Sequence, residues 1–462
     1  MPDFEDYQSP FSWRYGSAEM RSIWGEKNKR LTWRKLWVAM AEAQGPLKMV
    51  TSEQLQDLKA HMGDVNVIRA LEIERTIRHD LMAELKAYAE QCPKGGGILH
   101  LGATSMDIKD NAEVLLIGQS LDGIIGSLRK VIRILAEKIE MYANLPVMAF
   151  THLQPAEPTT LGYRLAGYAQ DFLKDLESLT NISGNLKGKG FKGAVGNAAS
   201  YVELYGTEGY QLFEDSLSQA LGLPFFEISS QTYTRKQDYE VMAALAGLAS
   251  TAHKFAFDLR ILQSQVIGEM AEPFGNEQVG SSAMPFKRNP VEAEKIGSLA
   301  RAVSTAPVTA WNNYANSLLE RTLDDSANRR TLIPEAFLAV DEILITLLKV
   351  LDGLKVNETA IKENLMKYGP FAGIERVMMR SVKAGADRQE MHELLRQVSM
   401  SAWEEIEQGK PNRLVELVKN ESRIACWFKD RELEELFAVE KYTGIAESRS
   451  RELAELIRET IS

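Results

Sequence analysis

One run of residues, from Asn111 to Tyr142, constrains the fold of this 462-residue chain more than any other. Apolar side chains recur along it every three or four residues with charged residues between them, which predicts one amphipathic helix of unusual length. Comparable patterns cover residues 159–179, 238–268, 290–319 and 334–351. Several long helices in the middle of a chain indicate an elongated bundle, so we expect an all-α fold.

Polar and glycine-rich breaks interrupt the helical patterns at CPKGGG, residues 92–97, and at DGLKVNET, residues 352–359. They predict three mostly helical domains with boundaries near residues 106 and 357. The expected domains are residues 1–106, a central long-helix bundle over residues 107–357, and residues 358–462. Several helical patterns are apolar over more than one face, which favours helices shared between subunits. A large monomeric core is the alternative.

Charge and cysteine content limit the classes of function. The chain has 54 Lys and Arg against 64 Asp and Glu, a formal charge of −10, so an extended nucleic-acid surface is not expected and any anionic ligand must meet local cations. No signal peptide pattern and no membrane-spanning run are visible. Cys92 and Cys426 show no disulfide or zinc-ligand spacing. We therefore expect a cytoplasmic protein that uses no metal and contacts neither nucleic acid nor membrane.

Three glycines, Gly188, Gly190 and Gly193, satisfy the dinucleotide motif G-x-G-x-x-G. The residues before them have helical rather than strand periodicity, and no βαβ pattern surrounds them. We interpret the glycines as a flexible connection with close backbone packing.

The stretch GSSAMPFKRNP, residues 280–290, interrupts the helical patterns with serines, prolines and cations. Asn289 followed by Pro290 predicts the start of a helix, with Lys287 at its positive end, which favours anion binding. Cations beside the hydroxyls of Ser281 and Ser282 would favour a deprotonated serine. The stretch therefore suits removal of a proton from a carbon next to a carboxylate, whose anionic intermediate the cations would stabilise. A surface loop before a well-capped helix is the alternative.

Histidine is the usual acid for protonating a leaving group near neutral pH. His152 lies in FTHLQPAEPTT, where two prolines favour an extended loop before a helix, so it is placed like a functional group or, alternatively, a hydrogen-bonded loop residue. His79, flanked by Arg78 and Asp80, could be oriented by them or belong to a surface charge cluster. His100 precedes a short polar turn. Structural roles are favoured for the three histidines within helical patterns, His61, His253 and His392.

GSSAMPFKRNP resembles the signature loop of the fumarase/aspartase superfamily, whose members eliminate fumarate from succinyl-type substrates. Within it, the wording SSAMP-x-KRNP is similar to the adenylosuccinate lyase family. Further matches follow in order along the chain: RYGSAEM, RHDLMAEL, HLGATSMDIKDN, FTHLQPAEPTT, SQTYTRKQDYE and ERTLDDSANRR. The resemblance implies a homotetramer with a central helical bundle and active sites drawn from more than one subunit.

The resemblance also implies a role for each matched residue. Ser281 would be the base and His152 the acid, with Glu294 paired to this histidine. Lys287 and Asn289 would bind the fumarate-side carboxylate and stabilise the intermediate. The other implied contacts are His79, Arg78 and Asp80 at the leaving-group region, Thr104, Ser105 and Thr151 at the succinyl carboxylates, Gln231 at the middle of the substrate, and Arg14, Tyr15, Arg321, Ser326 and Arg330 at the phosphate and ribose.

The activity implied by the resemblance is elimination of fumarate from adenylosuccinate, giving AMP, and from succinylaminoimidazole carboxamide ribotide, giving AICAR, in purine biosynthesis without a cofactor. Lys295 departs from the arginine that close relatives often carry and would make a single-point substrate contact, and Glu292 stands where some relatives have a basic residue. Argininosuccinate lyase or aspartase is the alternative within the superfamily. Outside it, a non-catalytic structural protein is disfavoured by the presence of Ser281 and His152, and a serine hydrolase by the lack of a G-x-S-x-G elbow.

Overall fold

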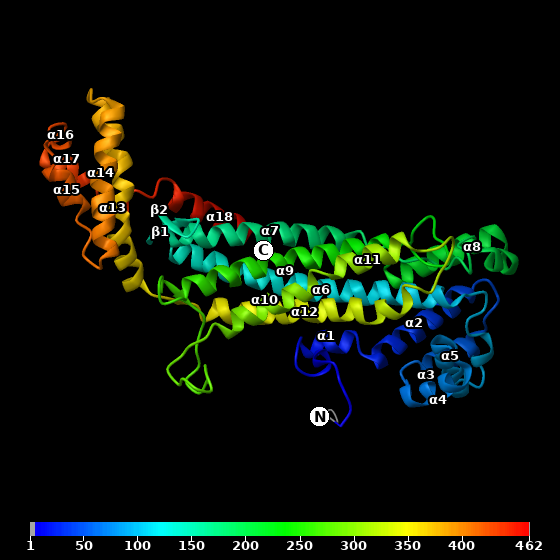
Figure 1. Ribbon diagram of the computed structural model, residues 1–462. Helices are drawn as coiled ribbons and strands as arrows, with labels where there is room; N and C mark the ends of the chain where they lie inside the picture. The colour runs from blue at the N-terminus through cyan, green and yellow to red at the C-terminus, as the bar shows by residue number, and fades with distance from the viewer. Residues whose placement is uncertain (1–4, 462) are drawn as a thin grey trace. The chain divides into compact units, whose positions relative to one another are not determined.

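The computed structural model describes residues 5–461, apart from the side chain of Asp430, and is mainly helical (Figure 1). Only two sheets occur among these residues, each of two antiparallel strands. The prediction of an all-α fold is confirmed. The longest helices are α6 (Ser105–Met141), α7 (Leu161–Gly184), α9 (Lys236–Leu262), α12 (Ser326–Asp352) and α13 (Glu358–Lys383). Over the described residues, none of the helices is long and apolar enough to cross a membrane.

The predicted long helices are present, but several of their ends differ from the prediction. The helix predicted from Asn111 begins six residues earlier, at Ser105. The range predicted as one helix over residues 290–319 is two helices, α10 (Val291–Val303) and α11 (Ala306–Ala315). Pro334 does not begin a helix, because α12 starts at Ser326 and continues through the proline. Proline removes one backbone hydrogen bond from a helix interior, a cost that the packing of such a long helix can outweigh.

The chain divides into two compact units, each built from three separate stretches. Unit 1 comprises Met1–Leu128, Asp175–Ala252 and Ser298–Ile345. Unit 2 comprises Arg129–Lys174, His253–Gly297 and Thr346–Ser462. The three domains expected from the sequence, with boundaries near residues 106 and 357, stay a prediction.

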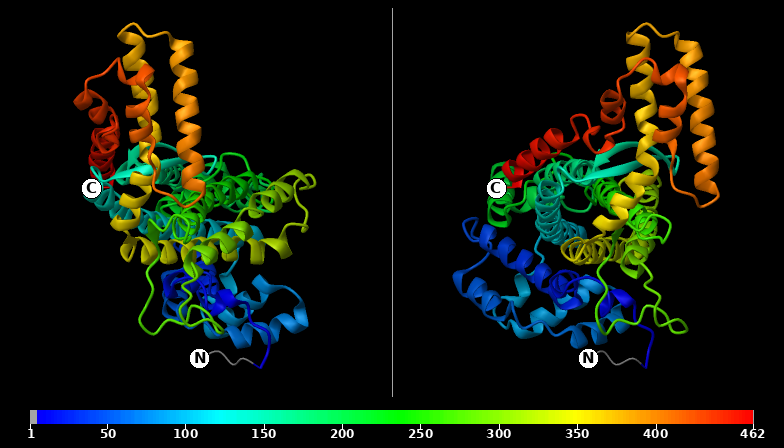
Figure 2. Two further views of the ribbon diagram at one scale, coloured as in Figure 1. Left: turned by 60° about the vertical axis from the view of Figure 1, so that its left-hand side comes forward. Right: turned by 90° about the vertical axis from the view of Figure 1, so that its left-hand side faces the viewer.

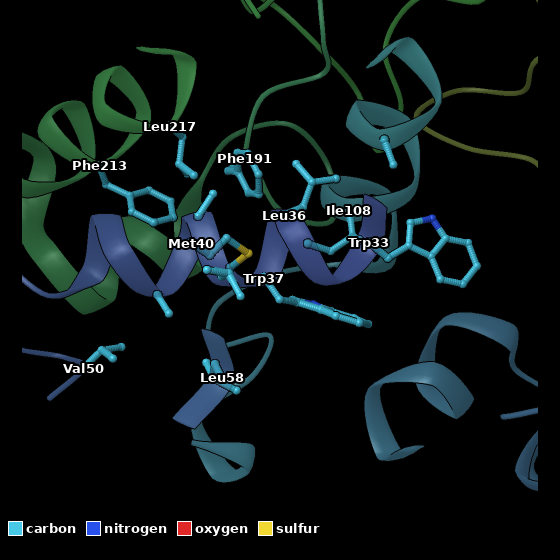
Figure 3. Packing of buried hydrophobic residues seen from close by; sticks show 14 of the residues in the cluster. Trp33, Leu36, Trp37, Met40, Val50, Leu58, Ile108, Phe191, Phe213 and Leu217 are labelled. Carbon is cyan, nitrogen blue, oxygen red and sulfur yellow. The ribbon is translucent and has the colours of Figure 1, made fainter. Parts of the chain in front are cut away.

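One hydrophobic cluster of unit 1 centres on α2 (Glu26–Gln44). Its Trp33, Leu36, Trp37 and Met40 follow the three- and four-residue steps of one helix face and are at most 2% exposed (Figure 3). They pack in one cluster with apolar side chains of other elements, including Leu58, Ile108, Phe191, Phe213 and Leu217. Burial of each large apolar side chain contributes about 1.5–3 kcal/mol, so this face fixes α2 in the unit. The other helices here are α1 (Ala18–Ile23), α3 (Ser52–His61), α4 (Val67–Ile77), α5 (Asp80–Gln91) and α8 (Ala199–Leu221).

Asp107 of α6 holds the glycine-bearing segment, residues 188–193, in place. Its buried carboxylate accepts hydrogen bonds from the backbone N–H groups of Lys192 and Gly193, each at 3.2 Å, and forms an ion pair with the ammonium of Lys189. Both side chains of this pair are fully buried. The predicted close backbone packing is confirmed, because a Cβ added at Gly188 would lie 2.4 Å from the Asn111 Oδ1. The connection is also held by a buried acid distant in sequence, which the interpretation as a flexible segment did not include. No βαβ unit surrounds the glycines within residues 5–461.

Unit 2 contains a hairpin, β1 (Pro146–Thr151) and β2 (Gln154–Thr160), and a second pair, β3 (Met270–Ala271) with β4 (Lys355–Val356). Figure 2 shows α13 running beside α14 (Arg388–Glu407). The buried carboxylate of Glu269 accepts from Arg164 at 2.8 Å and from Asn364 at 3.1 Å, which ties β3 to α7 and α13. The chain continues through α15 (Leu414–Asn420), α16 (Ser422–Ala425), α17 (Asp430–Leu436) and α18 (Ala446–Ile461).

Replacing Asp107 with alanine is expected to lower the free energy of unfolding by about 3–5 kcal/mol, because Lys189 would be left buried without its counter-ion. Urea unfolding followed by circular dichroism measures the change. Asp122→Ala is the matched control on the same helix, since Asp122 is exposed, and it should shift stability by no more than about 0.5 kcal/mol. Equal stability of the two variants would contradict the assigned role of Asp107.

Candidate active site

His152 lies at the tip of the β1–β2 hairpin in unit 2. His152 and Leu153 form the two-residue turn, with φ values of 54° and 60°. Two successive left-handed residues define a type I′ turn, and histidine tolerates this conformation better than most side chains. The extended loop predicted around His152 is thus a tight hairpin, whose second strand leads directly into α7. The imidazole is exposed and has no hydrogen bond or ion pair with any residue that the structure describes, and neighbouring Thr151 is exposed as well.

The signature loop, residues 273–290, joins β3 to α10 in unit 2 and is the extended green segment at the lower left of Figure 1. Within it, the Oγ of Ser281 accepts a hydrogen bond from the Met284 N–H at 3.1 Å. Gly280 comes so close to the carbonyl of Lys287 that an added Cβ would lie 2.1 Å from that oxygen, which only glycine avoids. Ser281 is partly exposed and Lys287 exposed, so both predicted residues are available to a ligand.

The start of α10 differs from the prediction in a way that affects anion binding. Asn289 does not cap the helix; its Nδ2 donates to the carbonyl of Gly280 at 2.9 Å. The carboxylate of Glu272 instead accepts hydrogen bonds from the N–H groups of Glu292 and Ala293, at 3.1 and 2.9 Å. The anion-binding position predicted at the start of this helix is therefore occupied within the chain by the carboxylate of Glu272.

Glu294 and Lys295 lie in the first two turns of α10. Glu294 is half exposed, and an Arg260 nitrogen lies 3.7 Å from its carboxylate. None of the contacts among residues 5–461 joins Glu294 to His152, so a single chain does not form the pair that the resemblance implies. Lys295 lies 2.9 Å from Glu292, whose carboxylate also accepts from Lys349 at 2.6 Å. Lys295 and Glu292, the two residues that depart from the family pattern, therefore neutralise each other's charge.

A second group of predicted residues meets in unit 1. His79 caps the N-terminus of α5, and its Nδ1 accepts a hydrogen bond from the Met82 N–H at 3.3 Å. Because Nδ1 is an acceptor, the hydrogen of the neutral ring lies on Nε2, which donates to the Ser105 Oγ at 3.3 Å. The two segments carrying His79 and Ser105 are thereby joined, and the tautomer of the histidine is set by the helix start.

Asp80, the next residue, connects two cations. Its carboxylate accepts from the Lys109 ammonium and from the Arg330 guanidinium, each at 2.8 Å. Burial favours a higher pKa for Asp80, but Lys109 and Arg330 outweigh it and hold the pKa well below its usual range. Lys109 was not predicted from the sequence. Its spacing of four residues from Ser105 on one helix face was the available signal.

A cavity of about 280 Å³ in unit 1 collects four predicted residues: Asp80, Arg321, Ser326 and Arg330. Lys109 and the aromatic rings of Trp24 and Trp33 also line it. Cations beside apolar surface suit a ligand with an anionic group and a flat ring.

Buried ion pairs adjoin this cavity. Arg321 donates to Asp325 at 2.8 Å, and Asp325 also accepts from Arg235 at 2.8 Å. Arg235 in turn donates to both oxygens of Asp110, at 3.0 and 3.1 Å. Arg321 is therefore oriented by residues that the sequence analysis did not single out.

The remaining predicted residues of unit 1 do not line the cavity. The guanidinium of exposed Arg14 lies 5.9 Å from the ring centre of Tyr15. The N–H of Gln231 donates to the carbonyl of Glu320, the residue before Arg321, at 3.2 Å. The Thr104 N–H donates to Asp107 at 2.9 Å. Exposed Arg78 ends α4 in a left-handed conformation with φ of 55°.

Comparison with known proteins assigns a class to this fold and site. A family model described as Lyase matches residues 17–304. The 3-carboxy-cis,cis-muconate lactonizing enzyme of Pseudomonas putida superposes with a TM-score of 0.86 at 22% identity, covering 99% of this chain and 100% of that one. A fumarate lyase from Mesorhizobium sp. BNC1 gives 0.84 at 24% identity, covering 97% and 99%. The chain therefore has the fold of this lyase class.

Closer relatives narrow the class to one family. A second family model, described as Adenylosuccinate lyase C-terminus, matches residues 371–452. The adenylosuccinate lyase of Saccharomyces cerevisiae is 38% identical, over 96% of this chain and 93% of the relative. That of Pyrococcus horikoshii is 36% identical, over 97% and 98%. This chain belongs to the adenylosuccinate lyase family.

His100, which accepts a hydrogen bond from Trp37 just before α6 begins, provides a test of the buried polar structure of unit 1. The Trp37 Nε1–H donates to its Nδ1 at 3.2 Å, and burial lowers the pKa of His100 to about 4. Since an unfolded histidine has a pKa near 6.5, the unfolded chain binds a proton first, and stability falls as pH falls between these values.

We expect this loss to reach about 3 kcal/mol more in the native protein than in His100→Gln, which keeps an acceptor for Trp37. Urea unfolding of both proteins between pH 7 and about 4 measures the difference. Parallel stability curves over that pH range would show that His100 is not held neutral by burial.

Proposed function

We propose that this protein is an adenylosuccinate lyase that releases fumarate from adenylosuccinate, leaving AMP, and from succinylaminoimidazole carboxamide ribotide, leaving AICAR. The observation that carries the proposal is the cavity of unit 1, in which Arg321, Ser326 and Arg330 converge in a member of this family. Both substrates share a ribose phosphate and a succinylamino group, so one site serves both. The reaction needs proton transfers and charge stabilisation by side chains, and the proposal includes no cofactor or metal.

The proposed elimination uses residues of unit 2. Ser281, as the alkoxide, takes the proton from the carbon next to the succinyl carboxylate, and the electron pair delocalises into that carboxylate. Lys287 and Asn289 stabilise this anion. The carbon–nitrogen bond then breaks, and His152 gives its proton to the leaving nitrogen, with Glu294 supporting the charge of the imidazolium. The exposure of His152 and Lys287 supports roles that need contact with a substrate.

The proposed substrate contacts of unit 1 bind the rest of the nucleotide. Arg321, Ser326 and Arg330 take the phosphate, with Arg14 and Tyr15 contributing from the N-terminal segment. His79, Arg78 and Asp80 contact the leaving-group side, and Gln231 the middle of the substrate. Thr104 and Ser105, with Thr151, hold the succinyl carboxylates, and Lys295 makes a single-point contact with the substrate. The hydrogen bond between His79 and Ser105 supports a shared site for the two segments that carry these residues.

A homotetramer with composite active sites completes the proposal. Within one chain His152 has no partner among the described residues, and its proposed partner Glu294 faces Arg260 instead. On α11, Val308, Trp311 and Tyr314 recur every three residues and are 64%, 53% and 46% exposed. An apolar stripe of this size on one helix supports burial against another copy. Free Cys92 and Cys426 suit a reducing compartment, the cytoplasm.

Ser281→Ala and His152→Ala are each expected to lower kcat for adenylosuccinate by at least about 10²-fold, the usual effect of removing a positioned base or acid. The absorbance of released fumarate measures turnover, and circular dichroism verifies folding. Asn276→Ala, an exposed position in the same loop, is the matched control and should keep kcat within about threefold.

Two results would contradict the proposal. Near-native turnover by Ser281→Ala would remove the assigned base. Failure of the native protein to release fumarate from either nucleotide would reject the activity itself.

A further inference from the structure

We propose that Glu272 is a positioning residue for the elimination: its buried carboxylate anchors the first turn of α10 and thereby fixes the Lys287–Asn289 end of the signature loop relative to Glu294. The inference rests on the proposed function, and no family motif in the sequence pointed to Glu272. It acts through other residues and does not itself contact the reacting atoms.

The residue before α10 is Pro290, which has no N–H, so the N–H groups of Val291, Glu292 and Ala293 are the three at the helix start without an intrahelical acceptor. Those of Glu292 and Ala293 donate to the two carboxylate oxygens of Glu272, at 3.1 and 2.9 Å. The N–H of Val291 donates to the carbonyl of Asn289, and that of Glu294 to the carbonyl of Pro290, each at 2.9 Å. The three amides without an intrahelical acceptor are therefore satisfied within the chain, and Glu272 accepts from two of them.

Helix caps usually come from a residue adjacent to the helix, and this one comes from twenty positions earlier. Glu272 directly precedes the signature loop, whereas Val291 directly follows it. The contact therefore closes the base of the loop, joining its entry to its exit.

A second side chain closes the same base. The Oε1 of Gln263 accepts from the N–H of Glu272 at 3.0 Å, and its Nε2 donates to the carbonyl of Arg288 at 3.2 Å. Gln263 thus connects the residue before the loop with a residue beside the proposed carboxylate-binding Lys287. The two anchors hold the loop ends from both directions.

The electrostatic surroundings show that the role of Glu272 is not to form an ion pair. It is 3% exposed, and none of the described Lys or Arg side chains forms an ion pair with it. Burial raises its pKa, as do the nearby carboxylates of Glu292 and Glu294, against the lowering effect of the two amides. The cations nearby are engaged elsewhere: Lys295 and Lys349 with Glu292, Arg260 with Glu294, and Arg288 over the Phe274 ring.

Burying the carboxylate of Glu272 near other carboxylates costs free energy, so a compensating interaction must stabilise it. The helix dipole and two charge-assisted hydrogen bonds provide it. The consequence for chemistry is that α10 offers no free amide to a substrate carboxylate. The anionic intermediate must be stabilised by the side chains of the loop, whose placement within about 0.5 Å then depends on the anchors.

Glu272→Ala is expected to lower kcat for adenylosuccinate by at least about tenfold with KM within about threefold, because the phosphate contacts of unit 1 are untouched. Glu272→Gln keeps an acceptor oxygen and should recover most of the loss. Glu277→Ala, an exposed carboxylate of the same loop, is the matched control and should resemble the native protein. If Glu272 had a purely structural role, Glu272→Ala would lower the fraction of folded enzyme. The folded enzyme would then show neither a lowered kcat at constant KM nor a recovery of kcat in Glu272→Gln.

Amide hydrogen exchange of the full-length protein tests the anchor without reference to activity. Exchange in the peptide containing Glu292 and Ala293 should accelerate in Glu272→Ala and stay native in Glu277→Ala. A kcat of Glu272→Ala within twofold of the native value overturns the proposal. If the native protein releases no fumarate, the proposed function fails separately, and unchanged exchange in Glu272→Ala then overturns the anchor. If the alanine variant does not fold, Glu272→Gln is measured instead. Accelerated amide exchange at Glu292 and Ala293 in this variant, together with a native kcat, overturns the positioning role.

Discussion

The buried guanidinium of Arg235, between Asp110 and Asp325, is the interaction on which the proposed nucleotide site of unit 1 depends. Its three donor nitrogens reach these carboxylates at 2.8–3.1 Å, and the three side chains are at most 3% exposed. Breaking such a pair leaves an unpaired buried charge, at a cost of about 3–5 kcal/mol. Because Asp325 also accepts from Arg321, the same pair orients a proposed phosphate contact. Three segments distant in the sequence thus form one rigid support for a cationic cavity in an acidic protein.

The proposed chemistry of unit 2 lies on short, well-fixed connections. His152 occupies a two-residue hairpin turn, and Ser281 a loop whose ends are tied by Gln263 and Glu272. In both cases the backbone is held while the side chain stays at least partly exposed, as the proposed site assembled from several copies requires. The acid and its proposed partner Glu294 do not meet within the described part of one chain. Completion of the site by neighbouring copies is the simplest account of that separation.

The sequence predicted the fold class and the long helices because apolar periodicity over many residues is a strong signal, as α6 illustrates. It also predicted four of the residues that line the cavity, through motifs. The sequence did not predict the long-range contacts. Asp107 contacts Lys189, which lies 82 positions away, and Glu272 caps α10 from 20 positions away. Asn289 had the right local features for a cap, yet tertiary packing gave that place to Glu272. The hairpin at His152 escaped prediction because prolines weaken strand signals.

In the proposed mechanism, one chain carries an incomplete set of catalytic groups, and copies of the chain complete it. Mixing Ser281→Ala with His152→Ala subunits tests this most directly, after dissociation and reassembly verified by native mass spectrometry. If base and acid of one site come from different copies, some sites in each mixed assembly contain both native residues. Fumarate release should then recover from about 1% in either parent to a substantial fraction of the native rate. Mixed assemblies as inactive as the parents would contradict the claim.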